Sequence, residues 1–197
     1  RGLPLSDIER ILRQNEKSVV ILDEAYVDFG GESAAGLIDR YPNLLVIRTL
    51  SKSYSLAGLR VGFALGAADL IEGIIRVKDS INSYTVDRLA QAGAREAIAD
   101  DAYFQETRAR IMRTRDRVTR ELEKSGFTVI PSQANFVFIS HSRCAGRDLF
   151  HKLREKGILV RYFDKPKIDN YLRVSIGTDE EMDRFLEAAA DLCRRGT

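Results

Sequence analysis

Three short apolar runs in the first third of the chain have the composition of β-strands. They cover residues 19–22, 44–47 and 61–65, and each is rich in Val, Ile and Leu and bounded by polar residues or glycine. Unbroken apolar runs of this length are typical of strands that other elements cover on both faces of a sheet. The pattern therefore predicts an α/β layer in this part of the chain.

Helical periodicity surrounds these runs. A short helix is expected over residues 6–14, and longer helices are expected over residues 68–78, 87–99 and 103–124. In the last of these, four apolar residues recur on one face: Phe104, Ile111, Val118 and Leu122. We expect this long helix to leave the first domain, so that residues 1–104 form one domain and residues 105–197 form a second.

The second domain has a different pattern, in which short strands alternate with helices. Strands are predicted over residues 127–130, 134–139, 158–163 and 171–176, with a helix over residues 147–156 that Gly157 ends. Thr178 and Glu181 have the spacing of a capping box and predict a final helix. The fold class is therefore α/β: a mostly parallel sheet with helices, followed by a small α+β domain.

Composition and charge narrow the classes of partner. The chain has 197 residues, is 44% hydrophobic, and carries 31 Lys plus Arg against 29 Asp plus Glu. This balance gives no general electrostatic reason to expect nucleic acid or an anionic membrane as a partner. Six arginines fall within residues 108–120, but acidic residues are interleaved with them, so this stretch is predicted to be a solvated helix face.

The cysteines and the apolar runs suggest where the protein resides. Cys144 and Cys193 lie in helical or helix-entry segments without metal-ligand spacing, which fits structural thiols in a reducing compartment. No apolar run reaches the length of a membrane span, and the first residues lack the apolar core of a signal peptide. A cytosolic location is expected.

Polar clusters follow two of the predicted strands at the point where each strand ends. Asp23 and Tyr26 follow the first run, and Ser51 and Lys52 follow the second. In open α/β sheets, ligands bind outside the carboxyl ends of the strands, so these side chains are candidates for one site. Taken singly, Asp23 is also suited to capping a turn and Lys52 to a solvated loop.

The order and spacing of these residues carry more information than any one of them. Arg60 follows Lys52 by eight residues within SKSYSLAGLRVG. This segment resembles the fold-type I aminotransferases, whose lysine segment reads as Ser-Lys followed by an Ala-Gly-x-Arg-x-Gly turn. The strings DEAYVDF, SQANFVF and LRVSIGT extend the resemblance over essentially the whole chain, to the histidinol-phosphate aminotransferase family of histidine biosynthesis. Residues 1–104 would then be the C-terminal portion of the large pyridoxal-phosphate-binding domain, and residues 105–197 the small C-terminal domain.

The chemistry of pyridoxal phosphate explains why these residue types suit the first domain. The amine of Lys52 can condense with the cofactor aldehyde as a Schiff base and later act as a base. Asp23 is suited to holding a proton on the pyridine nitrogen, and Tyr26 to donating a hydrogen bond to the phenolic oxygen of the ring. Ser51 and Arg60 are suited to the cofactor phosphate. The glycines at positions 58 and 62 are expected to allow close backbone approach.

The resemblance also implies substrate-binding residues in the second domain. Arg173, in LRVSIGT, matches the family's arginine that forks onto the substrate carboxylate and helps hold its phosphate. Arg161, in ILVRYF, matches a further phosphate-binding arginine, and Asn135 matches a position near the site. Bidentate geometry suits arginine to such anions, although a strand-edge salt bridge is the other interpretation of Arg161. The implied activity is transamination of histidinol phosphate with 2-oxoglutarate, giving imidazole acetol phosphate and glutamate, in a homodimer.

Other chemistries lack their motifs in this sequence. It contains no Gly-x-Ser-x-Gly elbow, no Gly-rich phosphate loop ending in Gly-Lys-Ser/Thr and no His-Glu-x-x-His metal helix, so no metal site is predicted. The two histidines, His141 and His151, are expected at the surface.

The resemblance implies that the chain begins at about the middle of a complete enzyme of this kind. The phosphate-cradling loop, the aromatic residue that stacks on the ring and the tyrosine from the partner subunit would lie in the other half. We therefore expect this piece alone to be inactive and prone to associate through exposed strand edges and apolar faces. A related aromatic aminotransferase, a threonine-phosphate decarboxylase and a non-catalytic binding or dimerisation module remain alternatives.

Overall fold

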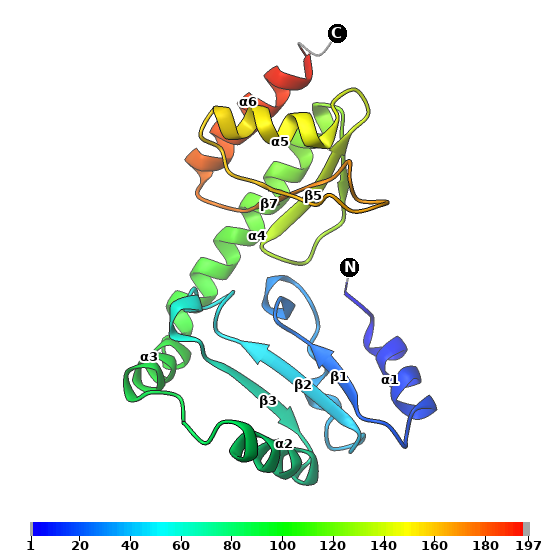
Figure 1. Cartoon of the computed structure of the whole chain (residues 1–197), viewed down its shortest axis with the longest axis vertical. Coiled ribbons are helices and arrows are strands. Elements are labelled where there is room, and N and C mark those ends of the chain that lie inside the picture. The colour runs from blue at the N-terminus through cyan, green and yellow to red at the C-terminus, as the bar shows by residue number, and fades with distance from the viewer. Residues whose placement is uncertain (1, 195–197) are drawn as a thin grey trace. The chain divides into compact units, whose positions relative to one another are not determined.

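Two separate β-sheets organise the chain, one in each of two units that divide between Arg108 and Ala109 (Figure 1). The structure is a computed structural model and describes residues 2–194. The division falls within one long helix, α4 (Asp101–Lys124).

The sheet of the first unit has three strands, in the order β1-β2-β3. They are β1 (Val20–Asp23), β2 (Leu44–Thr49) and β3 (Gly62–Gly66), so the three predicted strands are confirmed. β1 and β2 run parallel, whereas β2 and β3 run antiparallel. Short 3-10 turns follow the strands or connect them: η1 (Val27–Phe29), η2 (Ala34–Leu37) and η3 (Ala57–Leu59).

One face of this sheet carries the core of the unit. Helix α1 (Leu5–Gln14) places Ile8 and Leu12 against Leu44 and Val46 of β2, with η2 beside them. The other face is not covered in the part of the chain that the structure describes, because Ile21 and Ile47 are 58% and 39% exposed. The prediction of strands covered on both faces is therefore wrong for these residues. Apolar composition indicates that a side chain favours burial, but it does not identify the element that would cover it.

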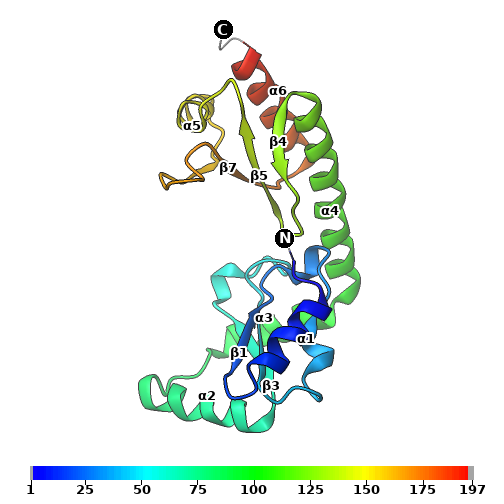
Figure 2. The same cartoon turned by 90° about the vertical axis from the view of Figure 1, so that its right-hand side faces the viewer.

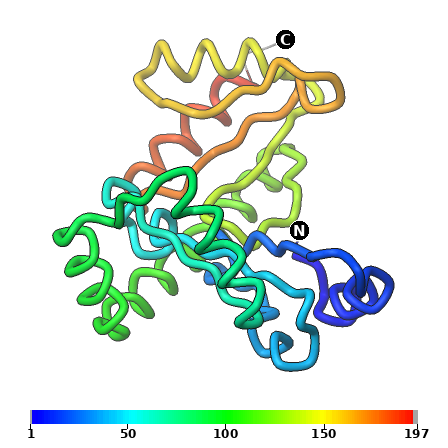
Figure 3. Tube along the Cα trace, turned by 60° about the horizontal axis from the view of Figure 1, so that its bottom comes forward, coloured from blue at the N-terminus to red at the C-terminus, as the bar shows by residue number. Residues whose placement is uncertain are grey.

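The remaining helices of the unit follow β3. They are α2 (Ala68–Ile81), α3 (Arg88–Ala99) and the first residues of α4. Helix α2 contacts β3, and helix α3 contacts η3. In Figure 1, α1 lies beside β1, whereas α2 and α3 lie on the β3 side of the unit, and Figure 3 shows the same trace from another side. Asp87 caps α3, because its carboxylate accepts hydrogen bonds from the backbone N–H groups of Leu89 and Ala90 at 2.9 Å.

The second unit has an antiparallel sheet in the order β4-β5-β7-β6 (Figure 2). Its strands are β4 (Phe127–Ile130), β5 (Phe136–His141), β6 (Arg161–Tyr162) and β7 (Leu172–Ser175). β6 is much shorter than the predicted strand over residues 158–163. Within residues 2–194, only Arg161 and Tyr162 of this run pair with β7, and Leu159 is 81% exposed, so most of the run precedes the sheet edge without strand pairing.

Two helices and the second half of α4 pack on one face of this sheet. Helix α5 (Gly146–Glu155) and helix α6 (Asp179–Arg194) follow the predicted pattern. The capping box at the start of α6 is confirmed, because Glu181 N donates to Thr178 Oγ1 and Thr178 N donates to Glu181 Oε2. The core joins residues from all three helices and from the inward positions of β5 and β7: Val118, Leu122, Val137, Ile139, Leu149, Leu153, Leu172, Val174, Met182 and Phe185.

Two predictions about polar surface residues in this unit are wrong. His141 is 4% exposed because it ends β5 on the same face as Val137 and Ile139, where strand alternation turns it into the core. His151 is exposed as expected. In the arginine-rich stretch, Arg115 is buried and donates to the carbonyl of Ala134 at 3.1 Å, so this helix is not a uniformly solvated face.

Both cysteines are buried free thiols in the core of the second unit. Burial, followed by the neighbouring Cys144, raises the pKa of the Cys193 thiol. A raised pKa keeps the thiol protonated and poorly nucleophilic, which fits a packing role.

Candidate active site

The parallel pairing of β1 and β2 brings the two predicted polar clusters to the same edge of the sheet. Asp23 ends β1 and pairs in register with Ile47, five residues before Lys52 in the sequence. Its side chain is exposed, and one carboxylate oxygen accepts a hydrogen bond from the backbone N–H of Ala25 at 3.0 Å. Asp23 therefore presents a carboxylate at the carboxyl end of the sheet, where ligands bind in open α/β folds.

Lys52 and Tyr26 lie together at this edge. The Lys52 Nζ atom is 5.5 Å from the centroid of the Tyr26 ring, and both residues are half-buried. An ammonium over the face of a tyrosine ring is a favourable arrangement that restricts where a flexible lysine points. Two of the predicted residues, from the segments after β1 and β2, thus direct an amine and a phenol to one place.

Ser51 and Arg60 belong to a loop that folds back on itself. Its ends are joined by the backbone bond from Leu50 N to Val61 O at 3.1 Å, and Leu56 N donates to Leu50 O at 3.0 Å. Arg60 is exposed, has a φ of 56°, and donates from Nη1 to the carbonyl of Ala57 at 2.9 Å. A non-glycine residue in the left-handed region is strained, and such strain concentrates at functional sites.

The two glycines of this loop differ in how closely they are packed. A Cβ atom added to Gly62 would lie 2.9 Å from the carbonyl oxygen of Arg48, whereas a Cβ added to Gly58 would meet nothing within 4 Å. The expected close backbone approach is therefore found at Gly62, where β3 pairs with β2, and not at Gly58.

Substitution of these glycines should separate the two environments. Gly62→Ala should lower the free energy of unfolding by about 1–3 kcal/mol, because the β2 backbone must move to relieve the contact. Gly58→Ala is the matched control and should change stability by less than about 1 kcal/mol. Urea unfolding of both variants measures this difference, and equal losses would contradict the packing that we describe.

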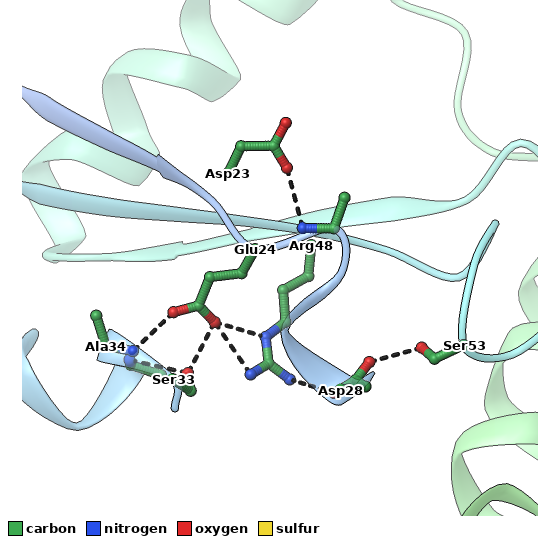
Figure 4. Close-up of polar contacts among 9 residues, drawn as sticks. Asp23, Glu24, Asp28, Ser33, Ala34, Arg48 and Ser53 are labelled. Carbon is green, nitrogen blue, oxygen red and sulfur yellow. Dashed lines mark hydrogen bonds and ion pairs between the residues drawn. The ribbon is translucent and has the colours of Figure 1, made fainter. Parts of the chain in front are cut away.

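A buried polar network lies on the opposite side of β1 from Asp23 (Figure 4). Glu24 Oε2 accepts hydrogen bonds from Arg48 Nε and Nη2, both at 3.1 Å, and from Ser33 Oγ at 2.8 Å. Its other oxygen accepts from Ala34 N at 2.6 Å. The guanidinium of Arg48 also reaches Asp28, at 3.7 Å from Nη1 to Oδ1.

The network ends beside the candidate lysine. Ser53, the residue after Lys52, is 3% exposed and donates its hydroxyl to Asp28 Oδ2 at 2.6 Å. Sequence analysis did not identify Glu24, Arg48, Asp28 or Ser53. The available signal was an arginine directly after an apolar run, since a charge in a buried strand requires a partner.

In the second unit, the two predicted arginines are direct neighbours. Arg161 and Arg173 pair in register across β6 and β7, so their side chains leave the sheet on the same face. Both guanidiniums lie over the Phe163 ring, at 5.5 Å and 5.9 Å from its centroid, and Arg173 also lies 5.4 Å from that of Phe136. Within residues 2–194, no carboxylate pairs with either arginine, and Asp164 instead binds Arg147 at 2.8 Å. Two uncompensated guanidiniums on one face are suited to an anion.

Asn135 lies directly before β5 and is half-buried. Its backbone carbonyl accepts a hydrogen bond from Ile176 N at 2.8 Å, which ties the start of β5 to the residue after β7. This contact places Asn135 in the sheet that carries Arg173, and its expected role toward a substrate remains a prediction.

The described residues carry neither a metal cluster nor a membrane-spanning helix. Between Gly2 and Arg194, no cluster of three or more His, Cys, Asp or Glu side chains is placed to hold a metal ion. No helix in that range has both the length and the apolar character that crossing a membrane requires.

An α/β sheet with an amine, a phenol and a carboxylate at its strand ends fits an enzyme that uses an aldehyde cofactor. The chain belongs to the aminotransferase class I and II family, which matches residues 2–188. This match confirms the family resemblance and the fold class expected from the sequence.

Several relatives of high sequence identity are histidinol-phosphate aminotransferases. The protein of that name from Clostridium acetobutylicum is 60% identical over 183 residues, which are 93% of this chain and 52% of the relative. Histidinol-phosphate aminotransferase 1 from Hydrogenovibrio crunogenus is 58% identical over 98% of this chain and 54% of the relative. The crystal structure of the Sinorhizobium meliloti enzyme in complex with pyridoxal-5'-phosphate superposes with a TM-score of 0.82 and 28% identity, covering 94% of this chain and 52% of that one. The chain thus spans about half the length of these relatives.

Proposed function

We propose that this chain supplies the lysine-bearing part and an anion-binding part of a pyridoxal-phosphate-dependent histidinol-phosphate aminotransferase. The reaction transfers the amino group of histidinol phosphate to 2-oxoglutarate. Its products are imidazole acetol phosphate and glutamate, and it is reversible. The observation that carries the proposal is the position of Lys52 Nζ, 5.5 Å from the Tyr26 ring centroid at the carboxyl edge of the sheet. Similarity to histidinol-phosphate aminotransferases at 58–60% identity supports the substrate.

The residues of the first unit fit this cofactor by their chemistry. Lys52 offers a half-buried amine and Tyr26 a phenol at the same edge, and Asp23 offers an exposed carboxylate there. Ser51 and Arg60 offer a hydroxyl and a guanidinium from one closed loop. An aldehyde, a pyridine nitrogen, a phenolic oxygen and a phosphate each find a matching group in this set.

Each residue then has a distinct task. When bound, the cofactor supplies an aldehyde that condenses with amines and a protonated ring that withdraws electrons from the substrate α-carbon. Lys52 would hold the cofactor through its aldehyde, and once the substrate amine has taken that place, the free Lys52 amine would accept the substrate α-proton and pass it on. Asp23 holds the proton on the ring nitrogen, and Tyr26 donates to the phenolic oxygen. Ser51 and Arg60 bind the phosphate.

Arg161 and Arg173 are proposed to bind the anionic end of the substrate. The two guanidiniums share one sheet face, both lie over the Phe163 ring, and neither has a carboxylate partner among the described residues. A phosphate carries more charge and more acceptor oxygens than a carboxylate, so a pair of arginines favours a phosphorylated substrate. Asn135 is proposed to assist from β5. A cytoplasmic homodimer is the form that we propose for the complete protein.

The substrate proposal is tested by replacing Arg161 in the complete gene product that carries this sequence. Arg161→Leu should lower kcat/KM for histidinol phosphate by about tenfold to a hundredfold, because one charge-assisted contact to the phosphate is lost. The same variant should change kcat/KM for an aromatic amino acid much less. Arg147→Leu is the matched control, since Arg147 is already paired with Asp164.

The outcome also separates the alternatives. Equal losses for phosphorylated and unphosphorylated substrates would contradict a phosphate role for Arg161. Turnover of threonine phosphate with release of carbon dioxide would indicate a decarboxylase, and turnover of aromatic amino acids alone would indicate an aromatic aminotransferase. Complete inactivity with every substrate would favour a non-catalytic module.

A further inference from the structure

The buried network of Figure 4 connects the two segments that carry the candidate cofactor residues. One segment begins at the end of β1 and contains Asp23 and Tyr26, and the other follows β2 and contains Lys52. Backbone pairing between them ends at the bond from Glu24 N to Ile47 O, which measures 2.9 Å. Beyond that bond, the two segments are joined by side chains.

Arg48 is the centre of these side-chain contacts. From β2 it reaches Glu24 with two nitrogens at 3.1 Å and Asp28 with a third at 3.7 Å. The side chains of Glu24, Asp28 and Arg48 are 8%, 18% and 25% exposed, so water weakens these contacts only partly. Charge-assisted bonds of this kind hold a guanidinium in one orientation.

Asp28 connects Arg48 to the segment that carries Lys52. It accepts the Ser53 hydroxyl at 2.6 Å, and Ser53 is bonded directly to Lys52 in the chain. The carboxylate of Asp28 is also close enough to act on the next residue: the pKa of Tyr54 is raised, first by burial and then by Asp28. Ser55, which follows, has a φ of 57°, and its N–H donates to the Lys52 carbonyl at 3.2 Å. The backbone conformation at Lys52 therefore depends on two contacts: the bond from Ser53 to Asp28 and the bond from Ser55 N–H to the Lys52 carbonyl.

We propose that Asp28 and Arg48 are positioning residues for Lys52, acting through Ser53. They fix the backbone from which the Lys52 amine reaches toward the Tyr26 ring. The inference rests on the proposed function, because the property at stake is the reactivity of Lys52 with the aldehyde of pyridoxal phosphate. It predicts that the network sets the rate of that condensation and leaves non-covalent binding of the cofactor unchanged.

The test uses the complete gene product and two probes. Pyridoxine 5'-phosphate lacks the aldehyde, so it reports non-covalent binding of ring and phosphate. The time course of covalent attachment at saturating pyridoxal 5'-phosphate gives the rate constant. Borohydride reduction fixes the attached cofactor, and peptide mass analysis then identifies the lysine that carries it. In Ser53→Ala and Asp28→Asn, the affinity for pyridoxine 5'-phosphate should be unchanged. The rate constant of covalent attachment at Lys52 should fall by about tenfold. Ser53→Thr keeps the hydroxyl and should recover most of the rate.

Ser80→Ala is the matched control, since the Ser80 hydroxyl donates only to the backbone carbonyl of Arg76 in exposed helix α2. Its rate constant should equal that of the unsubstituted protein. Loss of folded protein lowers the amplitude of labelling and not the rate constant, so a purely structural role is recognised by amplitude alone. If Asp28→Asn fails to fold, Ser53→Ala decides the question.

Two failures are distinguishable. Unchanged rate constants in Ser53→Ala and Asp28→Asn, with the unsubstituted protein labelled at Lys52, would overturn the positioning role and leave the proposed function standing. An unsubstituted protein that acquires no label at Lys52 would overturn the proposed function and this inference with it.

Discussion

Replacement of Lys52 by arginine should abolish transamination by the complete gene product, with turnover falling by about a thousandfold or more. Arginine keeps the positive charge and much of the length of lysine, but its guanidinium does not condense with an aldehyde and does not give up a proton near neutral pH. The variant therefore removes the proposed chemistry while it preserves the cationic contact with the Tyr26 ring. The measurement is single-turnover conversion of histidinol phosphate, followed by borohydride labelling.

Lys78→Arg is the control for this experiment. Lys78 lies in α2 and pairs with Asp79 at 2.7 Å on an exposed surface, so its replacement should change neither turnover nor labelling. Persistent label on another lysine in Lys52→Arg, with turnover retained, would show that Lys52 is not the attachment point. Loss of turnover with unchanged binding of pyridoxine 5'-phosphate would assign the defect to the amine.

Much of the candidate site was accessible from the sequence because it depends on strand topology. Asp23 and Lys52 were expected at one edge since parallel strands end on the same side, and β1 and β2 are parallel. The proximity of Lys52 to Tyr26 is consistent with this logic, but their distance depends on the fold of two loops. The roles of these residues stay predictions until they are tested.

The residues that sequence analysis missed depend on contacts between distant segments. Arg48 reaches Glu24 and Asp28 across 24 and 20 positions of the chain, and which acid it binds depends on the register of β1 and β2. His141 was misplaced for a simpler reason, since its strand continued two residues beyond the predicted end. β6 shows the opposite error: apolar residues such as Leu159 indicated a strand, whereas pairing partners exist for only two positions.

Replacement of Glu24 by glutamine should cost the first unit about 2–3 kcal/mol of unfolding free energy. The amide is nearly the same size as the carboxylate, so the packing of this 9%-exposed residue is kept. What changes is the charge and one acceptor: glutamine keeps one oxygen and has an NH2 donor in place of the other, so either Arg48 and Ser33 or the Ala34 N–H lose their acceptor, and the remaining acceptor is uncharged. Urea unfolding with hydrogen exchange of the peptides from β1 and β2 would measure the loss.

Glu72→Gln provides the surface comparison, because Glu72 pairs with Arg76 within α2 while both side chains remain more than half exposed. Exposed pairs of this kind contribute at most about 0.5 kcal/mol, so the two glutamine variants should differ several-fold. In the Arg48→Met background, the further loss from Glu24→Gln should be smaller, since the guanidinium that requires the charge is absent. Equal losses in both backgrounds would mean that Glu24 acts through Ser33 and Ala34, and that Arg48 is held by Asp28 alone.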